Sequence, residues 1–103
     1  MEQIERIKEM EACLDASEKA IQGLSKALEL FESVQPQFRK LCDYYSSDQW
    51  VEDYEDDENG KLPADLKRGV LSQDTVYDLI TENRELLVQM LKIAASTLES
   101  EGL

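Results

Sequence analysis

Apolar residues recur at alternating spacings of three and four over the first third of the chain, and this repeat constrains the fold most. The repeat positions are Ile7, Met10, Leu14, Ser17, Ile21, Leu24, Leu28 and Phe31. Such a heptad stripe predicts a long amphipathic helix. Smaller side chains recur every seven residues beside it, at Cys13, Ala20, Ala27 and Val34. The apolar face is therefore wide, which favours packing against two neighbours in a helical bundle.

A second long helix is expected over residues 73–100. Its apolar residues form two adjacent stripes, Tyr77, Ile80, Leu87, Leu91, Ala94 and Leu98 in one and Val76, Leu79, Leu86, Met90 and Ile93 in the other. Ser72 is expected as the N-cap, with Asp74 in the first turn, where its charge complements the helix dipole. Two amphipathic helices of this length predict a helical hairpin, because neither apolar stripe is stable in water alone.

The middle of the chain is predicted to hold shorter helices. Pro36 lacks an N–H and disfavours helix at the residue before it, and Asn59-Gly60 is a turn signal. We therefore expect helices at about 2–34, 37–47, 49–57 and 73–100 in one domain, 1–103. The predicted fold is all-α, an antiparallel bundle of two long helices bridged by one or two short helices and an ordered connector.

The charge of the chain excludes several classes of partner. It has 11 basic and 23 acidic residues in 103, a net charge of -12. This is the wrong sign for binding nucleic acid or an anionic membrane. No run approaches the roughly 20 apolar residues of a membrane span, and the acidic N-terminus does not resemble a signal peptide. We therefore expect a cytoplasmic protein, with Cys13 and Cys42 as free thiols packed in the core.

The residues that most catalytic and metal sites need are missing. There is no histidine, and two cysteines 29 positions apart do not form a zinc site. As a calcium loop, Glu55, Asp57 and Asn59 fit the first, third and fifth positions, but Pro63 and Leu66 fill the ninth and twelfth. We therefore expect no catalytic residues, no metal and no cofactor, and a protein that is not an enzyme.

Three runs of residues resemble a known family of small bacterial proteins, described only as a domain of unknown function. They are Tyr44-Tyr45-Ser46-Ser47-Asp48-Gln49-Trp50, then Glu52-Asp53-Tyr54-Glu55, and above all Gly60-Lys61-Leu62-Pro63-Ala64-Asp65-Leu66-Lys67-Arg68-Gly69-Val70-Leu71-Ser72. The start of the chain, Gln3-Ile4-Glu5-Arg6-Ile7, is also similar to the family. The resemblance implies a bacterial, helical, cytoplasmic protein. It implies no activity and no catalytic residues.

The candidate binding surface is an acidic and aromatic segment. Residues 48–62 contain seven acidic residues and one lysine, which is half of the net charge. The candidate partner-binding residues are Trp50, Asp53, Tyr54, Asp56 and Asp57. Tryptophan and tyrosine are enriched where protein partners bind most tightly. The alternative is that these aromatic residues pack the core and that the acidic residues form a solvated turn.

A weaker candidate is a pair of basic residues, Lys67 and Arg68, just before the helix that follows Ser72. Basic side chains beside a helix N-terminus can hold an anion. The alternative is that they pair with acids in Glu52–Glu58 and hold the connector against the acidic segment.

Two functions follow from these surfaces. The first is a protein-interaction or adaptor module that uses the acidic and aromatic surface to bind another protein. The alternative is a small-ligand or cation-responsive protein that uses the loop at 55–72. Uncovered heptad surface on the long helices also predicts self-association as a homodimer.

Overall fold

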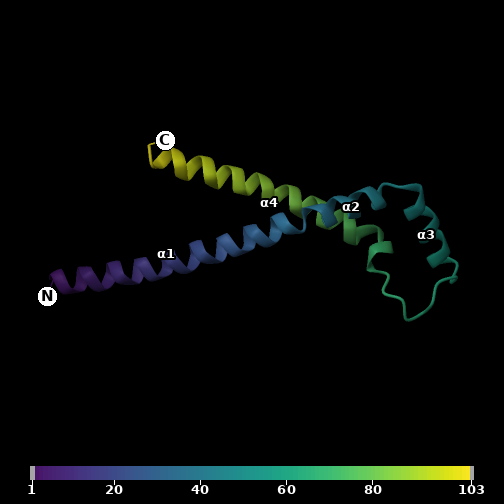
Figure 1. The fold of residues 1–103 in the computed structure, drawn as a ribbon, viewed down its shortest axis with the longest axis horizontal. Coiled ribbons are helices and arrows are strands. Elements are labelled where there is room, and N and C mark those ends of the chain that lie inside the picture. The colour runs from purple at the N-terminus through teal and green to yellow at the C-terminus, as the bar shows by residue number, and fades with distance from the viewer. Residues whose placement is uncertain (1, 103) are drawn as a thin grey trace. The chain divides into compact units, whose positions relative to one another are not determined.

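The computed structural model describes residues 2–102, which form four α-helices and no strand. The helices are α1 (Glu2–Ser33), α2 (Gln35–Tyr45), α3 (Asp48–Glu58) and α4 (Gln73–Ser100), with a short 3-10 turn, η1 (Gly69–Leu71), before α4 (Figure 1). The chain divides into two compact units, Met1–Arg39 and Lys40–Leu103. The prediction of an all-α fold is confirmed, and each predicted helix is present with bounds shifted by no more than two residues.

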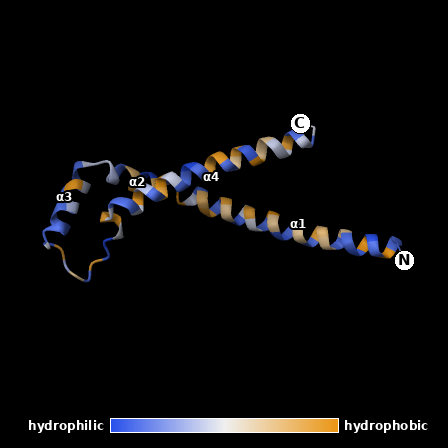
Figure 2. Cartoon of the chain, turned by 180° about the vertical axis from the view of Figure 1, so that it is seen from behind, coloured by the Kyte–Doolittle hydropathy of each residue, from blue (hydrophilic) through white to orange (hydrophobic). Residues whose placement is uncertain are grey.

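Helix α1 makes up most of the first unit. Glu2 and Glu5 lie in its first turn, where negative charge complements the helix dipole. No residue of α1 is buried, and eight of its large apolar side chains are 43–67% exposed. Figure 2 shows hydrophobic bands that recur along this helix. The expectation that Cys13 packs in the core is wrong, because this cysteine lies on the same exposed face.

The break between α1 and α2 is a single residue, Val34. Pro36 is the second residue of α2, a position where a missing N–H costs no internal helix bond. Backbone hydrogen bonds continue on both sides, from Val34 N–H to the Leu30 carbonyl (3.1 Å) and from Phe38 N–H to the Val34 carbonyl (2.9 Å). The predicted bounds of 37–47 for the second helix were therefore two residues too late, because Pro36 lies in the first turn of this helix and does not precede it.

Helix α3 is capped at both ends by local signals. The Ser47 hydroxyl accepts a hydrogen bond from Trp50 N–H (3.3 Å) at the N-terminus. At the other end, Gly60 has a φ of +69°, and its N–H bonds the Asp57 carbonyl (3.0 Å). Lys61 N–H bonds the Asp56 carbonyl (2.9 Å). These two bonds form a Schellman motif, which favours glycine at this position.

The buried residues of the second unit lie where α3 and α4 contact η1. Leu71 is 5% exposed and Val76 is 2% exposed. The Tyr45 hydroxyl donates to the Gln73 carbonyl (3.0 Å), which ties the end of α2 to the start of α4. Ser72 is the N-cap residue of α4 as predicted, but its side chain makes no capping hydrogen bond.

Candidate interaction surface

Trp50 is the centre of an aromatic cluster on one side of α3. Its ring stacks on Tyr54 with ring centroids 5.2 Å apart, and it meets Tyr45 edge to face at the same centroid distance. Its indole N–H donates to the Val70 carbonyl in η1 (2.9 Å). The spacing of four residues from Trp50 to Tyr54 places both rings on one face of the helix. The cluster therefore joins α2, α3 and η1.

Asp53 lies on the same side of α3, one turn from Trp50. The Tyr44 hydroxyl donates to its carboxylate (2.5 Å). Partial burial and the hydrogen bond to this carboxylate raise the pKa of Tyr44 from 10.0 to about 12, since both disfavour a phenolate beside a negative charge. Asp53 thus has an intramolecular partner.

Asp57 and Asp56, in the last turn of α3, face the connector. The Arg68 guanidinium bonds the Asp57 carboxylate at 2.7 Å, and both side chains are largely shielded, at 34% and 24% exposed. Lys61 lies 3.8 Å from Asp56, a longer and more exposed pair. Arg68 therefore holds the connector against the acidic segment, which was the alternative to anion binding. Lys67 is exposed and makes no ion pair within residues 2–102.

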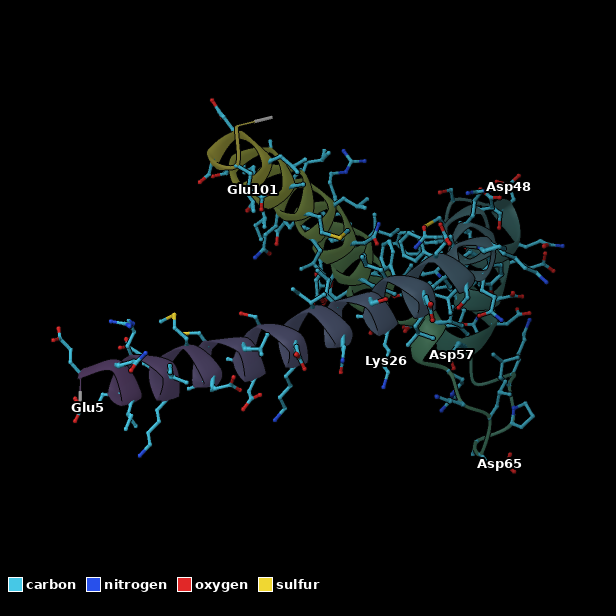
Figure 3. All side chains as sticks on the ribbon, turned by 60° about the vertical axis from the view of Figure 1, so that its left-hand side comes forward. Glu5, Lys26, Asp48, Asp57, Asp65 and Glu101 are labelled. Carbon is cyan, nitrogen blue, oxygen red and sulfur yellow. The ribbon has the colours of Figure 1, made fainter. Side chains whose placement is uncertain are left out.

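The remaining acidic residues of α3 point outward. Asp48, Glu52, Glu55 and Glu58 are exposed and follow one another at helical spacings of four, three and three residues. Figure 3 labels Asp48 at the start of α3 and Asp57 in its last turn. No basic residue lies in that last turn. Like charges at these spacings, and acids at the negative end of a helix dipole, both destabilise the helix. A positive charge placed here would relieve both effects.

An open hollow of about 450 Å³ lies between α3, η1 and the start of α4. Its lining includes Tyr54, Asp57, Arg68 and Asp74. Arg68 is already paired with Asp57 there. Within the part of the chain described, no three acidic or cysteine side chains are grouped closely enough to hold a metal ion.

The structure brings together the five predicted partner-binding residues, Trp50, Asp53, Tyr54, Asp56 and Asp57, but all five are half-buried. Their contacts are intramolecular, so their role in partner binding stays a prediction. The outward residues Glu52, Glu55 and Glu58 were not singled out from the sequence. A signal for them existed, because Trp50 and Tyr54 mark the inward face and Glu52 and Glu55 fall outside that face on helical spacing.

Comparison with known proteins gives a family. The sequence model described as "Domain of unknown function (DUF4298)" matches residues 7–93. The chain belongs to the DUF4298 family. The match covers all of α2, α3 and η1 and most of both long helices, so the surface described above lies inside the DUF4298 region. No curated protein and no solved structure matches the chain significantly.

Within residues 2–102, no helix of this DUF4298 chain is both long enough and apolar enough to span a bilayer.

Proposed function

We propose that the protein is a non-enzymatic interaction module whose exposed α3 carboxylates bind a basic segment of another protein in the cytoplasm of a bacterium. The observation that supports this proposal most is the outward row of Asp48, Glu52, Glu55 and Glu58. Their mutual repulsion, and the opposition of Glu55 and Glu58 near the C-terminus to the helix dipole, lower the stability of α3 when it is free. A cationic partner offsets that cost, so binding is favoured electrostatically.

The inward side of α3 supports the same proposal. The Trp50 cluster and the Arg68–Asp57 pair hold α3 against η1 and the connector, so the exposed carboxylates sit on an anchored helix. A surface that is ordered before binding loses less conformational entropy when the partner arrives. The predicted residues Trp50, Asp53 and Asp57 then act as the scaffold for the carboxylates that meet the partner.

The test compares three forms of the full chain as baits in bacterial lysate. One is the unchanged protein, one carries Glu52→Gln, Glu55→Gln and Glu58→Gln, and the control carries Glu2→Gln, Glu5→Gln and Glu9→Gln in α1. Both variants lose three negative charges, so they differ only in where the charge is lost. Retained proteins are quantified by mass spectrometry at low and high salt.

We expect a basic protein that is retained by the unchanged chain and by the α1 control, lost from the α3 variant, and released by salt. Salt releases it because exposed charges are screened over about 8 Å at physiological ionic strength. A list of retained proteins that is the same for all three baits would contradict the proposal.

The alternative, a ligand- or cation-responsive protein, is supported only by the polar hollow beside Asp57, Arg68 and Asp74. Ligand binding to the folded state raises the unfolding temperature by mass action. Thermal unfolding with calcium or with inorganic phosphate tests this directly. A rise with calcium that Asp74→Asn abolishes would favour the alternative, and so would a rise with phosphate that Arg68→Gln abolishes.

A further inference from the structure

The long helices expose most of the apolar surface of this chain. Of eighteen large apolar or aromatic side chains that are exposed, sixteen lie on α1 and α4, and these are 41–72% exposed. Figure 2 shows hydrophobic bands along both helices. Soluble monomers rarely leave contiguous apolar patches of more than a few hundred Å² uncovered. Sixteen exposed apolar side chains on two helices favour a covering partner.

The apolar face of α4 is too wide for one neighbouring helix. Its centre is formed by the buried Val76 and the half-buried Ile80. At about 100° per residue, the side chains on its two flanks lie roughly 170° apart around the helix axis. The exposed side chains are Leu79, Leu86 and Ile93 on one flank and Tyr77, Val88 and Leu91 on the other. The apolar stripe of a surface helix is typically about 100° wide, so the face of α4 is much wider than usual. Helix α4 therefore needs two neighbours.

Helix α1 has the same property. Ile7, Leu14 and Ile21 of its heptad stripe lie about 120° around the axis from the small residues Ala20 and Ala27, and the other heptad residues lie between them. The small residues allow close approach of a second helix on that side. The chain itself offers each long helix at most one other long helix, wherever the two units lie. Helix α3 has 11 residues, against 32 in α1 and 28 in α4, and is too short to cover either.

We infer that the covering partner is a second copy of this chain, and that the long helices of two copies form a four-helix bundle. Two copies supply four long helices of similar length, about 48 Å for α1 and about 42 Å for α4. In a four-helix bundle every helix has two neighbours, which matches the two-sided faces of α1 and α4. A twofold axis closes the assembly without leaving an apolar face free to recruit further copies.

The charges of the two copies make this association distinguishable from binding of a basic protein. Each copy has a net charge of -12, so two copies repel one another at long range. Screening by salt shortens the range of this repulsion, from about 30 Å at 0.01 M salt to about 3 Å at 1 M. Salt therefore strengthens self-association, whereas it weakens the interaction proposed for α3. Failure of one proposal leaves the other unaffected.

The test is sedimentation equilibrium of the full chain from about 1 to about 100 µM, the range of typical reversible association, at low and high salt. The unchanged protein is expected at twice its mass of 11.8 kDa, with a dissociation constant that falls as salt rises. A mass of one chain over the whole range at both salt concentrations would overturn the inference.

Matched variants locate the interface. Ile21→Glu places a charge in the heptad stripe, and Ala12→Glu adds the same charge on the polar side of α1, with a good helix former at each site. We expect Ile21→Glu to raise the dimer dissociation constant at least about tenfold and Ala12→Glu to change it less than about twofold. Equal effects of the two variants would place the interface elsewhere and overturn the inference.

A second variant covers the case in which Ile21→Glu loses helicity, as measured by circular dichroism. Leu91→Glu changes a side chain of α4 that is 72% exposed. It is expected to weaken the dimer to a similar degree while the helical signal is kept. An unchanged dimer with Leu91→Glu would overturn the assignment of α4 to the interface.

Discussion

At the scale of single residues, Trp50 joins three elements of the second unit, α2, α3 and η1. It stacks on Tyr54, meets the ring of Tyr45 and donates its indole N–H to the Val70 carbonyl. Phenylalanine keeps most of the ring contact but removes the donor, which leaves that carbonyl without its partner. The cluster is therefore a sensitive place to test the packing of α3 against η1.

We expect Trp50→Phe to lower the free energy of unfolding by about 1–2 kcal/mol, the usual cost of leaving a shielded polar group unpaired. Urea unfolding followed by far-ultraviolet circular dichroism measures the change. Val51→Ala, at the neighbouring exposed position, is the control and is expected to change the free energy by less than about 0.5 kcal/mol. Equal free energies for the two variants would show that the indole bond contributes nothing.

Tyr44 provides a prediction on pH. Its pKa is raised to about 12 in the folded chain, first by burial and then by the hydrogen bond to Asp53, against 10.0 for a free tyrosine. Above pH 10 the unfolded chain loses this proton before the folded chain does. The stabilising contribution is therefore complete below pH 10 and is lost as the pH rises through 12.

Absorbance titration of the phenol groups measures this shift. We expect Asp53→Asn to lower the pKa of Tyr44 from about 12 toward 10. Circular dichroism at each pH checks that the chain is still folded. A titration curve that is the same with and without Asp53→Asn would show that the Tyr44 phenol and the Asp53 carboxylate do not interact in solution.

At the scale of elements, the end of α3 depends on the left-handed backbone at Gly60. A Cβ at this glycine would meet no atom within 4 Å, so its φ of +69° is the sole obstacle to a side chain. Left-handed backbone costs a residue with a side chain roughly 1–2 kcal/mol. The acidic last turn of α3 and the connector after it depend on the same two Schellman bonds.

We expect Gly60→Ala to lower the free energy of unfolding by about 1 kcal/mol. Gly69→Ala is the matched control, because a Cβ there also meets open space and the backbone is not left-handed. That change is expected to be neutral or to stabilise by up to about 1 kcal/mol through the unfolded chain. Chemical unfolding measures the free energy of unfolding of both variants. An equal loss of this free energy in the two would contradict the role of the left-handed turn.

The positions of the helices could be predicted from the sequence, because helix formation depends largely on residues close together in the chain. The heptad of α1 and the turn signal at Asn59-Gly60 act within a few residues of themselves, and the bounds of α1 and α3 follow the prediction closely. Pro36 was expected to exclude Gln35 from a helix, but it lies in the first turn of α2. Ser72 differs, since its position as N-cap was predicted correctly but its hydroxyl makes no capping bond. A propensity specifies where a helix begins, whereas a particular hydrogen bond also depends on side-chain rotamers.

At the scale of the whole molecule, the net charge of -12 opposes folding by self-repulsion. Only two ion pairs occur within residues 2–102, Lys61–Asp56 and Arg68–Asp57. Screening therefore weakens many repulsive interactions and few attractive ones. The balance favours greater stability at higher salt.

We expect the melting temperature to rise between low and high sodium chloride at a fixed protein concentration. The variant with Glu2→Gln, Glu5→Gln and Glu9→Gln has three fewer negative charges and should show a smaller rise. Thermal scans by circular dichroism measure both. A fall in melting temperature with salt would mean that attractive ion pairs outweigh the repulsion.

The helical class, the approximate bounds of the helices and the acidic character of residues 48–62 can be predicted from the amino-acid sequence, because periodicity, caps and charge are properties of neighbouring residues. Which acidic residues have intramolecular partners depends on the tertiary fold. Asp53 accepts a hydrogen bond from Tyr44, and Asp57 forms an ion pair with Arg68. Glu52 and Glu55 on the same helix are exposed to solvent. The physical reason is that a helix presents its residues in all directions. The packing of Trp50 against η1 chooses which face of α3 turns inward.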